Sequence, residues 1–105
     1  MEAEKYRVIL KKDPENPAAL RALGEAAAAE KRWEELVDYL QREAQICEHP
    51  GEKADLLLRK ARSLHQYLAR PQDALDCLKI ALESYPAMRA ARQLEWQLLI
   101  ELELF

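Results

Sequence analysis

The sequence predicts an all-α protein built as a string of antiparallel helical hairpins. Half of its 105 residues are hydrophobic, which is enough to bury one modest core. The chain is rich in Ala, Leu, Glu, Arg, Lys and Gln, which lose little free energy on entering a helix, and it contains only two glycines. Apolar residues recur with a helical period in about six segments. These expected helices are 2–12, 17–30, 33–47, 52–68, 72–84 and 88–104.

Prolines mark the boundaries of these segments, because proline is tolerated at a helix start but breaks a helix interior. The chain has five, at positions 14, 17, 50, 71 and 86. The connections between the expected helices are short, so consecutive helices should run antiparallel. They are 13–17, 30–32, 48–51, 69–71 and 85–87.

Two of the hairpins share one pattern of small and apolar residues. Leu57 follows Leu20 by 37 residues, and Leu78 follows Leu40 by 38 residues. A fixed period of this length indicates stacked repeats that bury a continuous core. The repeated positions are Leu20, Gly24, Ala27, Leu36, Leu40 and Ala44 in the first hairpin and Leu57, Ala61, Leu64, Ala74, Leu78 and Leu82 in the second.

The flanking segments extend the pattern to the whole chain. Tyr6 to Leu10 followed by Asp13-Pro14 is similar to Leu78 to Leu82 followed by Tyr85-Pro86, two repeat lengths further on. We therefore predict a single domain over 1–105 that is cut from a longer array. Its parts are the second helix of a partial repeat (1–14), two repeats (17–50 and 51–86) and a terminal helix that is a partial repeat or a cap (87–105).

At several of these positions the chain resembles the tetratricopeptide repeat family. The matching residues are the Leu23-Gly24 pair, Ala74, Ala81, Pro86 and Tyr6. The resemblance implies a right-handed α-solenoid whose first helices line a concave, partner-binding face. Three residues depart from the family pattern: Leu36 and Glu43 stand where alanine is preferred, and Trp96 stands where a small residue allows two helices to cross.

The resemblance also implies which residues line the concave face. They are Ala18, Arg21, Glu25 and Ala28 in the first repeat, Asp55, Leu58, Arg62 and His65 in the second, and Gln93 and Gln97 in the last helix. This mixture of charged, small and apolar side chains suits an extended or helical peptide. Chaperone-binding family members grip a terminal carboxylate here with Lys and Asn, and Glu25 argues against that role.

Two hypotheses about function follow. The first is an interaction scaffold that binds a peptide or helix of another protein in the concave groove. The alternative is a structural spacer or homo-oligomerisation module whose groove holds no ligand. Both hypotheses are inferred from what such folds usually do.

The last predicted helix adds a possible self-association surface. Its sequence is very apolar, and large uncovered apolar patches usually mark an interface. A homodimer through this helix would use Trp96, Leu98, Leu102 and Phe105.

We expect no enzymatic activity, no cofactor and no bound metal. Cys47, His49, His65 and Cys77 lack the closely spaced pairs of a zinc site, and both cysteines are expected to be reduced. No glycine-rich loop is present that could cradle a phosphate or expose Ser63 or Ser84 as a nucleophile. Trp33 and Trp96 are interpreted as packing residues instead of ligand-stacking aromatics.

The charge pattern bounds the partners. A net charge of −3 with both signs interspersed argues against nucleic acid, and no apolar run is long enough to span a membrane. The amino terminus has no secretory signal pattern, so a cytoplasmic location is expected. The even use of Ala, Leu, Arg and Glu suggests a bacterial source.

Overall fold

A computed structural model describes residues 2–103 of the chain, and the side chains of residues 4–103. Within this range the protein is all-α, with six helices and no strand. The helices are α1 (Glu2–Lys12), α2 (Pro17–Ala29), α3 (Trp33–Ile46), α4 (Pro50–Gln66), α5 (Pro71–Ser84) and α6 (Arg89–Glu101).

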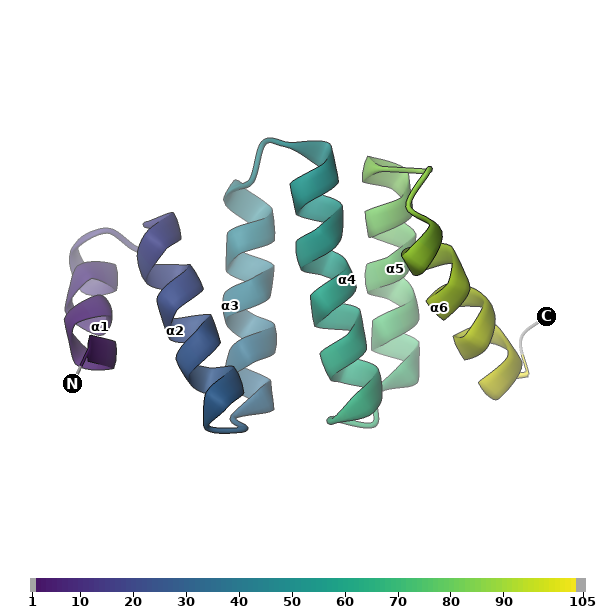
Figure 1. Cartoon of the computed structure of the whole chain (residues 1–105), viewed down its shortest axis with the longest axis horizontal. Helices are drawn as coiled ribbons and strands as arrows, with labels where there is room; N and C mark the ends of the chain where they lie inside the picture. The colour runs from purple at the N-terminus through teal and green to yellow at the C-terminus, as the bar shows by residue number, and fades with distance from the viewer. Residues whose placement is uncertain (1, 104–105) are drawn as a thin grey trace.

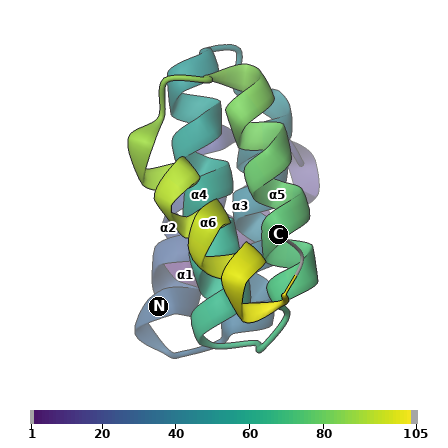
Figure 2. The same cartoon turned by 90° about the vertical axis from the view of Figure 1, so that its right-hand side faces the viewer.

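The helices form two layers. The main packing contacts join helices that are consecutive in the chain, with α4 and α5 packed most extensively, and the described part measures 46 × 27 × 16 Å. In Figure 1, α2, α4 and α6 lie toward the viewer, with α3 and α5 behind them. Figure 2 looks along the long axis and shows α6 in front, between α4 and α5. Helix α3 therefore lies in the layer behind α2 and α4.

Prolines begin three of the helices. Pro17, Pro50 and Pro71 each occupy the first turn, where a missing N–H leaves no hydrogen bond unmade. Helices α4 and α5 consequently begin at these prolines, slightly earlier than predicted from the apolar pattern. Asn16 caps α2, because its side-chain oxygen accepts a hydrogen bond of 2.9 Å from the backbone N–H of Ala19.

The turns that close the two central hairpins each contain a residue with a positive φ. Lys31 and Ala69 have φ values of 60° and 51°, in the left-handed region that favours glycine. In each turn the next residue donates a backbone hydrogen bond to a carbonyl of the last helical turn: Arg32 N to Ala27 O at 2.8 Å, and Arg70 N to Leu64 O at 2.9 Å. Ala69 follows Lys31 by 38 residues, the same offset that relates α3 to α5.

The core lies where the repeated apolar positions meet. All twelve of these positions are buried or partly buried. Gly24 faces α3, and a Cβ added to it would lie 3.6 Å from the Cβ of Tyr39, an ordinary contact distance. The largest fully buried side chains are Leu20, Leu23, Leu75, Leu78 and Leu98.

The last helix is oriented differently from the prediction. Ala91 and Leu98 are its buried residues, and each follows a buried alanine of α4 (Ala54 or Ala61) by 37 residues. Trp96 is 60% exposed, so its interpretation as a packing residue is wrong, and so is its assignment to the position where a small residue allows two helices to cross. Leu98 occupies the buried position instead, because the 37-residue period of α4 continues into α6.

Candidate functional site

An open groove lies between α2 and α4, above α3. Its wider part has a volume of about 740 Å³ and extends to the turn between α3 and α4. Its narrower part has a volume of about 300 Å³. Arg21, Glu25, Glu43 and Arg59 line both parts, so we treat them as one surface, the α2–α4 groove.

The two parts of the groove differ in chemistry. The wider part is the more polar of the two and carries five carboxylates, those of Glu25, Glu43, Glu48, Glu52 and Asp55, against the two guanidinium groups of Arg21 and Arg59. The narrower part is mostly apolar, although Arg62 also reaches it. Its apolar lining comes from Ala28, Trp33, Leu36, Leu40 and Tyr67.

Trp33 joins α3 to α4 at the narrow end. Its ring stacks on that of Tyr67, with centroids 3.8 Å apart and planes 7° from parallel. Nearby, the guanidinium of Arg70 donates a hydrogen bond of 2.7 Å to the carboxylate of Glu34. The packing role predicted for Trp33 is therefore present, and the partner helix is α4.

Glu43 is the buried acid of the groove. It lies on α3, is 7% exposed and lines both parts of the groove. Its carboxylate forms no ion pair with any residue in the part of the chain that the structure describes. Burial raises the pKa of this carboxyl above its ordinary value, while the positive charges of Arg21 and Arg59 lower it and Glu25 raises it.

Five of the residues predicted for the concave face line this groove. They are Arg21, Glu25, Ala28, Asp55 and Arg62. Ala18 and Gln93 are exposed on α2 and α6, and they are not part of the groove lining. Leu58 departs from the prediction: it is 4% exposed and belongs to the core cluster that also contains Leu98.

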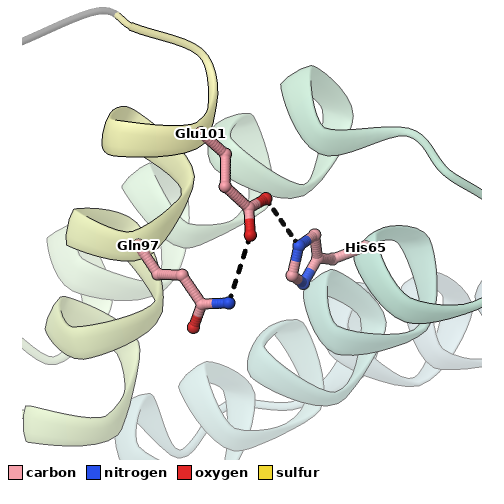
Figure 3. Close-up of polar contacts among 3 residues, drawn as sticks. All are labelled: His65, Gln97 and Glu101. Carbon is pink, nitrogen blue, oxygen red and sulfur yellow. Dashed lines mark hydrogen bonds and ion pairs between the residues drawn. The ribbon is translucent and has the colours of Figure 1, made fainter.

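His65 and Gln97 meet each other at a different place, through a residue that was not predicted. Glu101 accepts a hydrogen bond of 3.2 Å from the side-chain amide of Gln97, and it lies 2.8 Å from Nε2 of His65. Figure 3 shows the three side chains converging between α4 and α6. These hydrogen bonds, with that of His65 as the larger cause, lower the pKa of Glu101. His65 and Gln97 thus join two helices in this structure.

The residues proposed for self-association through the last helix differ in their exposure to solvent. Trp96 is exposed, and Ile100, one helical turn further on, is 58% exposed. Leu98 is fully buried and Leu102 packs against the same core, so neither presents a free surface as predicted. Phe105 lies outside the described residues.

Sequence reasoning noted Glu43 but did not assign it to the groove. The signal was a charged residue at a position where the repeat pattern expects a small one. Arg59 carried no such signal, because a charged residue on an amphipathic helix is most often solvated. Its guanidinium lies 3.2 Å from the carboxylate of Asp55.

Comparisons with known proteins add no identification. No protein-family model matches the chain, and no curated protein is significantly similar to it. Among residues 2–103, no group of three or more His, Cys, Asp or Glu side chains is placed to hold a metal ion. In the same range, no helix is both long and apolar enough to cross a membrane.

Proposed function

We propose that this chain is part of a tetratricopeptide-like, right-handed helical solenoid and that it binds a segment of another protein in the α2–α4 groove. Two repeat features support the solenoid. Buried positions recur at offsets of 37 and 38 residues, and Lys31 and Ala69, at equivalent turns, both have a positive φ. Hairpins of this kind bury their faces by stacking on neighbours.

The observation that carries the binding role is the groove itself. Three helices bring charged side chains and an apolar wall together around one open volume. Ligand sites are commonly concave, with a mostly apolar lining and a few placed polar groups. A solvated helix face would need neither a buried acid nor a mostly apolar end.

A peptide selection tests this proposal. The purified chain is presented to a library of random linear peptides, and the affinity of enriched peptides is measured by calorimetry. We expect Arg21→Ala, Glu25→Ala and Arg62→Ala to weaken binding while the helical circular dichroism is unchanged. Lys79→Ala, on the exposed side of α5, is the control. Failure to enrich any peptide, or equal binding by all four variants, would contradict a binding groove.

The structural alternative is favoured by a different observation. Trp96 and Ile100 form an exposed apolar stripe on α6, and such stripes are typical of interfaces. We propose as a second function a homo-oligomer through this helix. Sedimentation over a concentration series would then show a dimer that Trp96→Ala dissociates, whereas a monomer at every concentration would reject it.

A further inference from the structure

We propose that the α2–α4 groove selects a segment that carries a lysine or arginine side chain, and that the carboxylate of Glu43 receives its cationic group. This inference rests on the proposed function and adds the chemistry of the partner. It also assigns Glu43 as the residue that determines specificity.

The first support is that the side chain of Glu43 is 7% exposed and has no ion-pair partner among the described residues, while its carboxylate opens onto the groove and not into the closed core. An ionised carboxylate removed from water is costly unless a cation or hydrogen-bond donors compensate for the lost hydration. Arg59 is engaged by Asp55 at 3.2 Å, and no ion pair joins Arg21 to Glu43. A bound ammonium or guanidinium group would supply a charge-assisted hydrogen bond at this position.

The second support is the charge of the surroundings. Carboxylates outnumber guanidinium groups in the wider part of the groove, where Glu48, Glu52 and Asp55 lie on the side of α4. A field of this sign attracts a cationic side chain and fixes its register. The groove therefore complements a basic residue both at its floor and around its rim.

The third support is the apolar wall at the narrow end. Trp33, Leu36 and Leu40 lie on α3, the helix that carries Glu43, and contribute apolar lining to the narrow part that Glu43 also lines. A peptide whose basic side chain reaches Glu43 would place a neighbouring residue against this wall. We therefore expect the selected segment to combine a basic residue with an adjacent leucine, methionine or aromatic residue.

An anionic segment is the competing occupant. Arg21, Arg59 and Arg62 all reach the narrow part of the groove and would attract a carboxylate or phosphate. Glu25 and Glu43 lie among these arginines, and a buried acid with no partner would repel the ligand at close range. The observations accordingly favour the cationic segment, and an acidic consensus is one outcome of the test.

The test compares the peptides selected by the wild-type chain and by Glu43→Gln. The probe is the most enriched linear peptide, synthesised together with a counterpart in which norleucine replaces lysine or arginine. Glu83→Gln is the matched control, because it makes the same change of charge at an exposed position of α5 outside the groove. Circular dichroism and the denaturation midpoint of each variant confirm that it is folded.

We expect basic residues to be enriched by the wild type and by Glu83→Gln, but not by Glu43→Gln. Loss of one partner of a buried charge pair should weaken binding of the basic peptide by roughly 30-fold. The norleucine peptide should bind the wild type and Glu43→Gln with similarly low affinity. Glu43→Asp, which keeps the charge, should retain the preference for a basic residue.

The failures of the two proposals are distinguishable. Peptides that bind the groove but show no basic preference, an acidic consensus, or unchanged affinity in Glu43→Gln would overturn the role of Glu43 and leave the groove as a binding site. Equal weakening by Glu43→Gln and Glu83→Gln would reduce the effect to net charge. An absence of any selected peptide would overturn the proposed function itself.

Discussion

Helix α4 has different surroundings on its two sides. Toward α2 there is an open groove with an unpaired acid at its floor, whereas toward α6 the side chains of His65, Gln97 and Glu101 join the helices. The repeat period relates the two sides: Leu58 follows Arg21, and His65 follows Ala28, by 37 residues. The same repeated backbone arrangement thus forms an open groove between α2 and α4 and a closed contact between α4 and α6. The difference lies in a few side chains at equivalent positions.

A second series of positions shows how the closed side is anchored. Gly24, Ala61 and Leu98 follow one another at 37-residue intervals, and all three are buried. Leu98 fills its position with a large side chain that belongs to the same cluster as Leu58 and Ala61. Leu98 therefore helps to anchor α6 to the core, together with Ala91.

The largest expected effect is a loss of stability when the packing of α6 on the core is disrupted. Leu98→Ala should lower the free energy of unfolding by about 2–5 kcal/mol, because it leaves a cavity where a leucine is fully buried. Urea denaturation followed by circular dichroism measures the change. Trp96→Ala on the same helix is the control, expected to change stability by less than about 0.5 kcal/mol because Trp96 is exposed. Equal effects of the two variants would contradict the register of α6.

The next effect tests whether the two central hairpins are equivalent. Lys31→Gly and Ala69→Gly should each raise the free energy of unfolding by about 0.5–1 kcal/mol, because glycine relieves the left-handed backbone. Thermal denaturation measures both. Ala22→Gly, inside α2, should instead cost about 1 kcal/mol. Stabilisation at only one turn would show that the hairpins differ more than their dihedral angles suggest.

A smaller expected effect is the dependence of stability on pH that arises from Glu43 in the α2–α4 groove. The pKa of Glu43 is raised in the folded protein from an ordinary value of 4.5, mainly by burial. Between the ordinary and the raised pKa the folded state binds this proton more tightly than the unfolded state does, so the associated stability is present at low pH and is lost as pH rises through the raised pKa. Arg21 and Glu25 of α2 and Arg59 of α4 act on this group, with Arg21 and Arg59 opposing the shift.

Glu43→Gln should accordingly be more stable than the wild type at neutral pH, and the difference should shrink as pH falls toward 4.5. Denaturant titrations at several pH values measure it. Glu83→Gln is again the control, and a stability difference for Glu43→Gln that grows on acidification would give the wrong sign for a buried, unpaired acid.

The smallest expected effect concerns the contact between α4 and α6. Its dependence of stability on pH has the opposite sign to that of Glu43. Hydrogen bonding to His65 and then to Gln97 lowers the pKa of Glu101. Stability from this contact is therefore present above the ordinary pKa of a glutamate and is lost as pH falls through the lowered value. Glu101→Gln should be slightly less stable than the wild type near neutrality. A double-mutant cycle with His65→Ala measures the coupling, and additive effects would mean that the contact contributes nothing.

Much of the fold was predictable because it depends on local patterns. The apolar period located six helices with starts within two residues of those observed, and prolines mark the starts of three of them. The end of α6 was predicted less accurately, because the apolar pattern extends to residue 104 whereas the helix ends at Glu101. The left-handed turn residues were missed, because Lys31 and Ala69 give no local signal for a conformation that glycine usually adopts.

The candidate site was predictable only where the neighbouring helices keep the spacing of a repeat. Arg21, Glu25 and Arg62 were placed on the concave face by resemblance, and they line the groove. Leu58 was placed there by the same rule but is buried, because it packs in the core cluster that also contains Leu98 of α6, a contact that the resemblance did not predict.

The two tryptophans of the chain lie in contrasting surroundings, which makes the protein its own optical probe. Trp96 is largely in water, whereas Trp33 is half-buried against Tyr67 at the end of the groove. Replacing Trp96 with phenylalanine leaves a single indole, positioned where an occupant would displace solvent. The fluorescence of that chain would then follow the filling of the groove in real time, with no attached label.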